Sequence, residues 1–72
     1  MDLIEHEHSE NMRREAAAEK LREIADMLSR HNEIRFELKG ISTSVDVPNE
    51  VEFSFEVEVG SDGSEIEIEI SW

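Results

Sequence analysis

The sequence predicts an α+β fold in which one amphipathic helix packs on a four-stranded antiparallel meander. Three observations predict it. Apolar residues recur at helical spacing between about Asn11 and Arg30, apolar and polar residues alternate from Ile34 to the C-terminus, and turn residues interrupt that alternation. Because 72 residues are enough for only one small core, we expect a single domain over residues 1–72.

The helix is predicted from a stripe of apolar residues that repeats every three to four positions. The stripe consists of Ala17, Ala18, Leu21, Ile24, Ala25 and Leu28. Asn11 or Ser9 is expected to cap the first turn through its side-chain oxygen, and Asp26 and Arg30 are spaced for an ion pair on one face. Asn32 can adopt the left-handed conformation that ends a helix.

The strands are predicted from an apolar–polar period of two, interrupted near Lys39-Gly40-Ile41, Pro48-Asn49-Glu50 and Gly60–Gly63. One face is expected to be buried, and it carries Ile34, Phe36, Leu38, Thr43, Val45, Val47, Val51, Phe53, Phe55, Val57, Val59, Ile66, Ile68, Ile70 and Trp72. The turn lengths predict Val45 opposite Phe53, Phe53 opposite Ile70 and Val51 opposite Trp72. A slip by one residue would bury the glutamates, so the pattern specifies the register.

Residues 1–9 form either a short fifth strand or a tail, since only Leu3 and Ile4 are apolar among residues 2–8. A four- or five-stranded sheet leaves two edges with unpaired backbone groups. A strand at the N-terminus could cover one edge or pair with a neighbouring copy, and we therefore expect that the chain can self-associate as a homo-oligomer.

The charge balance excludes several classes of partner. Nineteen acidic and seven basic residues give a net charge of −12, and residues 40–72 contain no basic residue. Binding to nucleic acid relies on Lys and Arg displacing counterions, so we expect no direct nucleic-acid partner.

No apolar run is long enough to span a bilayer and no signal peptide is recognisable, which predicts a cytoplasmic protein without a membrane partner. The chain has no cysteine, so neither a disulfide nor a thiolate metal site can stabilise it.

Three segments together resemble a known family. They are the alanine-rich helix Ala-Ala-Glu-Lys-Leu-Arg-Glu-Ile-Ala-Asp-Met-Leu (17–28), the strand end Val-Asp-Val-Pro (45–48) and the C-terminal Ile-Glu-Ile-Glu-Ile-Ser-Trp (66–72). From about residue 2 to Trp72 the chain resembles the amphi-Trp domain family. Members of this family are small acidic proteins that are frequent in halophilic archaea and also present in bacteria. Asn32 departs from the Gly expected after the helix. The resemblance implies the fold and carries no biochemical activity.

Carboxylates on the polar face of the last two strands are the first candidate site. The predicted register places Glu58 opposite Glu65 and Glu56 opposite Glu67, although like charges facing each other destabilise a sheet. This face is interpreted mainly as a solvated surface adapted to high ionic strength, where charge repulsion is screened. Weak binding of divalent cations, which favour oxygen ligands, and docking of a basic protein are the alternatives.

The second candidate site is the pair His6 and His8, which would share one face of a strand. Two imidazoles can begin a transition-metal site, but a closed zinc site needs four ligands. The third histidine, His31, follows at the far end of the helix. Exposed polar side chains at an edge or in a tail are therefore the simpler interpretation.

Catalysis is not expected, because the chain lacks a nucleophile motif, a phosphate-binding glycine loop and a core large enough for a deep pocket. Trp72 shares the parity of the buried residues and is predicted to belong to the core. The sequence favours a non-catalytic acidic interaction or structural module without a cofactor, which associates with itself or with a basic protein. The alternative is a weak metal-binding protein that uses either the two N-terminal histidines or the four glutamates named above.

Overall fold

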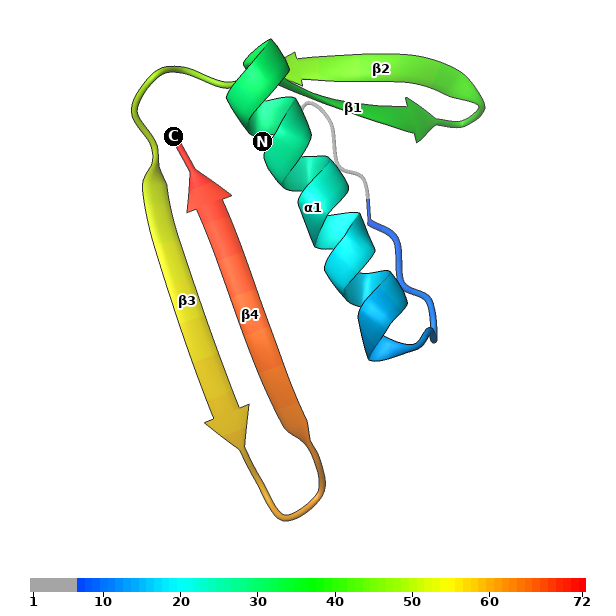
Figure 1. Ribbon diagram of the computed structural model, residues 1–72, viewed down its shortest axis with the longest axis vertical. Helices are drawn as coiled ribbons and strands as arrows, with labels where there is room; N and C mark the ends of the chain where they lie inside the picture. Colours follow the sequence, from blue (N-terminus) through cyan, green and yellow to red (C-terminus); the bar gives the residue numbers. More distant parts are fainter. Residues whose placement is uncertain (1–6) are drawn as a thin grey trace.

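The structure, a computed structural model, describes residues 7–72 and contains one helix followed by four strands (Figure 1). The elements are α1 (Arg14–His31), β1 (Glu33–Leu38), β2 (Ile41–Asp46), β3 (Glu52–Val59) and β4 (Ser64–Ser71). The predicted α+β class and the order of its elements are confirmed. Residues 7–13 have no regular secondary structure, and the rest of the N-terminal strand predicted over residues 1–9 lies outside the described residues.

Helix α1 starts later than predicted and ends as predicted. Its N-cap is Arg13, whose side chain makes no capping hydrogen bond, so the prediction of Asn11 or Ser9 as the cap was wrong. Neither of those residues is adjacent to the first helical turn, and their side chains are too far along the chain to serve it. At the other end Asn32 is left-handed, with φ 55° and ψ 25°. Its carbonyl accepts a hydrogen bond from the backbone N–H of Val47 at 2.8 Å.

Strands β1 and β2 form an antiparallel hairpin with a shorter turn than predicted. Leu38 pairs with Ile41, so the loop is Lys39-Gly40 alone. Both loop residues have positive φ, 53° and 81°, as a two-residue hairpin turn of type I′ requires, and glycine meets that requirement without strain at the second position. Ile34 lies opposite Val45, and the predicted assignment of side chains to the two faces is preserved.

Strands β3 and β4 form a second antiparallel hairpin in the predicted register. Val59 pairs with Ser64 and Phe53 with Ile70, and the backbone N–H of Gly60 donates to the carbonyl of Gly63 at 2.9 Å. The four-residue loop was therefore assigned correctly. Trp72 falls one residue beyond the end of β4, so the predicted pairing of Val51 with Trp72 is not part of the ladder.

The two hairpins are separate two-stranded sheets, which corrects the prediction of one four-stranded meander. The predicted pairing of Val45 with Phe53 is absent from the described strand ladders. The end of β2 is bound elsewhere, since the N–H of Val47 donates to Asn32 at the C-terminus of α1. Pro48 follows and has no N–H to donate to a neighbouring strand.

Helix α1 contacts the first hairpin through strand β1. The backbone N–H of Arg35 on β1 approaches the sulfur of Met27 on α1 at 3.3 Å. Apolar side chains near the end of α1 and in the first hairpin are half-buried. They include Leu28, Ile34, Phe36, Leu38, Val45 and Val47. Among the described strands α1 contacts β1 alone, and the predicted packing of the helix across a single four-stranded sheet is not found.

The second hairpin runs beside α1 at a distance (Figure 1). No Cα of α1 lies within 8 Å of a Cα of β3 or β4. The radius of gyration is 14.1 Å, whereas a compact chain of this length has about 11 Å. Among the described residues no hydrophobic side chain is fully buried, so the single chain does not close the predicted core.

Candidate functional site

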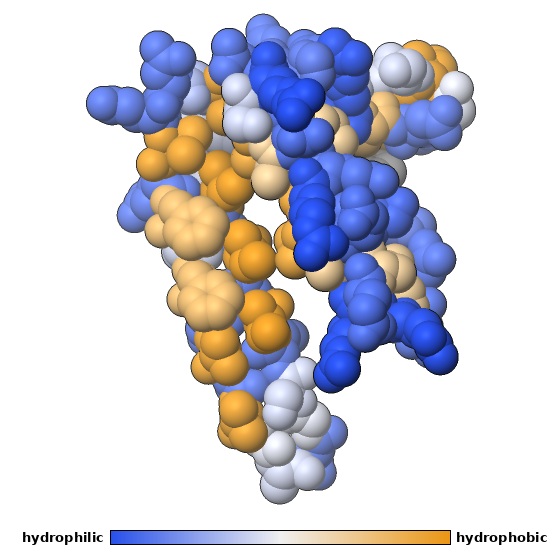
Figure 2. All heavy atoms as spheres, viewed as in Figure 1, coloured by the Kyte–Doolittle hydropathy of each residue, from blue (hydrophilic) through white to orange (hydrophobic). Residues whose placement is uncertain are grey.

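The main candidate site is the apolar face of the β3–β4 hairpin. Alternate residues of both strands point to one side, as the pleat of a strand requires, and Figure 2 looks onto these side chains. The exposed large hydrophobic residues of this region are Val51, Phe53, Phe55, Val57, Val59, Ile66, Ile68 and Trp72. We refer to these eight residues as the apolar face.

The exposure of the apolar face overturns a prediction. Phe53 and Phe55 are 62% and 61% exposed, and Trp72 is also 61% exposed, although all three were predicted to lie in the core. Phe36 has the same parity in the first hairpin and is half-buried. The parity of each side chain was therefore correct, and what is missing is an element that covers the second hairpin.

Two apolar grooves separate the hairpin from the helix. Leu21, Ile24 and Leu28 of α1 form one wall of both grooves, and Ile68 and Ile70 of β4 contribute to the opposite wall. The grooves have volumes of about 440 and 320 Å³. Figure 2 shows the open space between these two parts of the molecule. The apolar stripe of the helix is thus exposed on the side that faces the hairpin.

The opposite face of the hairpin is acidic, as predicted. Glu58 lies opposite Glu65 and Glu56 opposite Glu67. The pKa of Glu67 is raised above its ordinary value of 4.5, first by the charge of Glu65 and then by that of Glu56. We call these four glutamates the acidic cluster. Because all of them carry like charge, the cluster repels itself and does not form ion pairs across the ladder.

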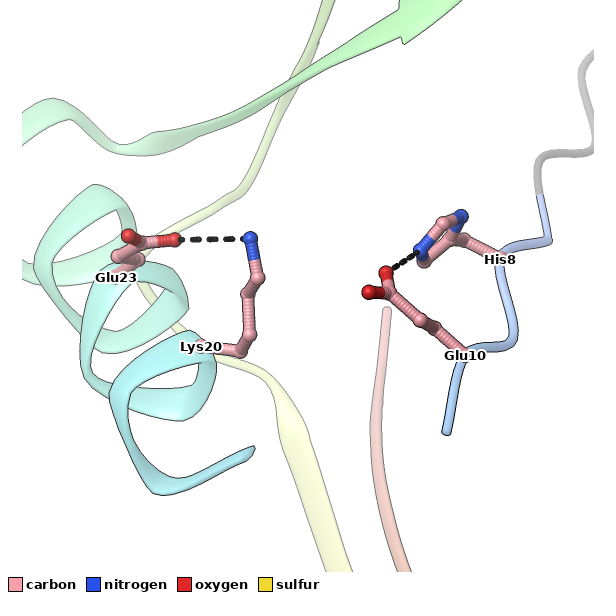
Figure 3. Close-up of polar contacts among 4 residues, drawn as sticks. All are labelled: His8, Glu10, Lys20 and Glu23. Atoms are coloured by element: carbon pink, nitrogen blue, oxygen red, sulfur yellow. Dashed lines mark hydrogen bonds and ion pairs between the residues drawn. The ribbon is translucent and has the colours of Figure 1, made fainter. Parts of the chain in front are cut away.

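Of His6 and His8, the two histidines considered as metal ligands, the structure describes only His8. His8 contacts Glu10 at 3.0 Å between Nε2 and a carboxylate oxygen, both side chains being exposed (Figure 3). His6 lies outside the described residues. His31 is exposed at the end of α1. Over residues 7–72 no group of three or more His, Cys, Asp or Glu side chains has an arrangement that could hold a metal ion.

Ion pairs lie on the outer surface of the helix. Lys20 and Glu23 are 4.0 Å apart (Figure 3), and the predicted pair of Asp26 and Arg30 is present at 3.6 Å. Their side chains are largely exposed, so each pair contributes only a few tenths of a kcal/mol. These charged side chains lie in water, so the apolar stripe is the part of the helix surface that would gain from burial.

The sequence did not reveal that the apolar stripe and the apolar face would remain open. Leu21 and Ile24 have the helical spacing of core residues and are nevertheless exposed. One feature of the sequence could have indicated this exposure. A high proportion of the 72 residues alternates between apolar and polar in predicted strands, and a single short helix cannot cover two hairpins. In residues 7–72 we also find no helix with the length and apolar character needed to cross a membrane.

Comparison with known proteins agrees with the pattern of one helix and acidic, amphipathic strands. The family model described as the Amphi-Trp domain matches residues 2–72, which is nearly the whole chain. No curated protein and no solved structure matches the chain. The resemblance seen in the helix, the Val-Asp-Val-Pro segment and the strand ending in Trp72 is thereby confirmed. The chain belongs to the Amphi-Trp domain family.

Proposed function

We propose that this protein is a non-catalytic, acidic interaction module that binds a protein surface through its apolar face. One observation carries the proposal: no hydrophobic side chain among the described residues is fully buried, while the apolar face is exposed. Soluble proteins rarely leave contiguous apolar surface of more than a few hundred Å² in water, and such surface commonly marks a binding site.

The composition of the apolar face supports binding to protein. It combines the only Trp of the chain with two Phe residues and branched aliphatic residues, and aromatic residues are enriched at the centres of protein interfaces. The face carries no charged residue that would have to lose its water on binding. Burial of such surface contributes about 25 cal/mol per Å², which makes a cover for it strongly favourable.

The acidic cluster supports an arrangement in which the module binds through its apolar face while the reverse side of the hairpin remains in water. Crowded carboxylates keep a protein soluble through its net charge and are tolerated best where salt screens them. We place the protein in a cytoplasm of high ionic strength on this basis. Docking of a basic protein on the acidic cluster would be a second, separate contact, since this surface points away from the apolar face.

Metal binding is the alternative function, and its support is weaker. The glutamates of the acidic cluster lie on an open, flat ladder, and the described residues bring no further oxygen or nitrogen ligands to them in an arrangement that could hold an ion. Ca²⁺ and Mg²⁺ take six or more oxygen ligands, and in dedicated calcium sites a surrounding loop supplies several of them. The interaction module therefore remains the proposal that the geometry favours.

Photo-crosslinking in cells tests the proposed function. A benzophenone amino acid is introduced in place of Phe55 on the apolar face or in place of Ser54 on the reverse side of the same strand. We expect protein adducts from position 55 and few or none from position 54. Equal labelling at the two positions, or no adduct at position 55, would contradict binding through the apolar face.

A further inference from the structure

The exposed surface of this chain is far larger than a folded monomer of its size needs. The total accessible surface is 6908 Å², whereas a compact monomer of 8.3 kDa has about 4,600 Å². Residues 1–6 could contribute at most about 1,000 Å² of the difference. About 1,300 Å² therefore remains uncovered on each chain. A protein interface of standard size buries about 800 Å² on each partner, so the excess is enough for a stable dimer.

The grooves beside α1 reach only part of the apolar face. The grooves between helix and hairpin are lined on the hairpin side by Phe53, Ile68, Ile70 and Trp72. Val59 lies farther toward the turn and is 80% exposed. The half of the hairpin next to the turn thus needs a cover that α1 of the same chain does not provide.

The charges of the hairpin point to the nature of that cover. A basic partner would be attracted to the acidic cluster on the reverse side and would leave the apolar face in water. The surface that meets the apolar face must instead be apolar and free of charged side chains. Its owner must be available whenever the chain is made, because a chain of this size without a closed core is marginally stable. A second copy of the chain meets both conditions.

On these grounds we propose that two copies of this chain pack the apolar faces of their β3–β4 hairpins against each other in a two-fold symmetric dimer. This inference rests on the proposed function and names its partner. The same residues meet on both sides of a two-fold interface, so Phe55 and Val57 of each copy are covered. Packed sheets lie about 10 Å apart, and the two acidic clusters then point outward on opposite surfaces. Their separation exceeds the screening length of about 8 Å at physiological salt, so the net charge does not prevent the contact.

The test combines molecular mass with the accessibility of the apolar face, on the purified full chain in molar KCl. Sedimentation equilibrium gives the mass, and binding of the dye anilinonaphthalene sulfonate reports exposed apolar surface. We expect twice 8.3 kDa and little dye binding. Phe55→Glu should weaken dimerisation at least 100-fold, whereas Ser54→Glu, which adds the same charge on the reverse side, should leave the mass unchanged.

Two other outcomes would separate this inference from the proposed function. A mass of 8.3 kDa with strong dye binding would overturn the dimer and leave the apolar face available to a different protein. The same mass with little dye binding would mean that the chain covers the face itself, and both proposals would fail. If Phe55→Glu does not fold, dilution of the unmodified protein decides, because the melting temperature of a dimer falls with concentration and that of a monomer does not.

Discussion

The two hairpins of this protein have the same sequence pattern and different surroundings. In β1–β2 the inward-facing side chains are half-buried, and the end of β2 is bound to the C-terminus of the helix through Asn32. In β3–β4 the pattern is longer and more regular, yet nearly all of its apolar side chains are exposed. The difference shows that an alternating pattern predicts which face will be buried and does not predict what will bury it.

The largest effect is expected from truncating one aromatic residue in each hairpin. Phe36→Ala should lower the free energy of unfolding by about 2 kcal/mol, less than the roughly 3–5 kcal/mol of a fully buried Phe. If a second chain covers the apolar face, Phe55→Ala should cost about as much. Urea unfolding measures both, and Ser54→Ala on the reverse side is the matched control. A change of under about 0.5 kcal/mol for Phe55→Ala would mean that this side chain stays in water.

The junction between α1 and β1 provides the next largest effect. Asn32→Ala should destabilise the protein by about 1 kcal/mol, because alanine is strained in the left-handed conformation that Asn32 adopts. Asn32→Gly should be neutral or slightly stabilising, since glycine adopts this conformation freely. Thermal unfolding followed by circular dichroism measures both variants. Equal stability of the two variants would argue that the backbone at this position can relax.

A smaller effect is expected in the acidic cluster, where it depends on pH and salt. The raised pKa of Glu67 means that the folded state binds its proton more tightly than the unfolded state. This contribution to stability is fully present below about pH 4.5, the unfolded value, and is lost as the pH rises through the folded pKa. Glu67→Gln should therefore raise the melting temperature at pH 7 and have little effect below pH 4.5.

Salt and a neighbouring residue provide the controls for that measurement. In 1 M KCl the screening length falls to about 3 Å, so the increase in melting temperature caused by Glu67→Gln should shrink. The unmodified protein should then melt at a higher temperature than in dilute buffer. Glu52 lies opposite Ser71, with no carboxylate across the ladder. Glu52→Gln should therefore raise the melting temperature at pH 7 by less than Glu67→Gln does. An identical gain from both variants would point to net charge and not to the opposed pairs.

The smallest effect is expected from metal ions. Titration of the full chain with Zn²⁺ or Ca²⁺ in molar KCl should give no heat above that of dilution, because the described residues do not assemble a ligand set. His6→Ala/His8→Ala is the variant for a positive zinc signal, and Glu56→Gln/Glu67→Gln is the one for calcium. Saturable binding that the matching variant abolishes would support the metal-binding alternative and assign it to that cluster.

Local features of the fold were predictable because they depend on residues close together in the chain. The end of α1 at Asn32, the turn at Gly60–Gly63 and the register of Phe53 with Ile70 each follow from backbone preferences and short-range alternation. The start of the helix was missed because Arg13 is not a capping residue and carries no signal. The acidic cluster was predicted with its partners, since it follows directly from the register.

The sequence by itself thus determined the elements, their order, the faces of the strands and the acidic outer surface. Only the tertiary structure decided that β2 and β3 do not pair and that α1 contacts β1 but neither β3 nor β4. Burial is non-directional, so an apolar face is equally satisfied by its own helix, by a neighbouring strand or by another chain. The choice among them depends on distant contacts, such as the hydrogen bond from Val47 to Asn32, which no local pattern specifies.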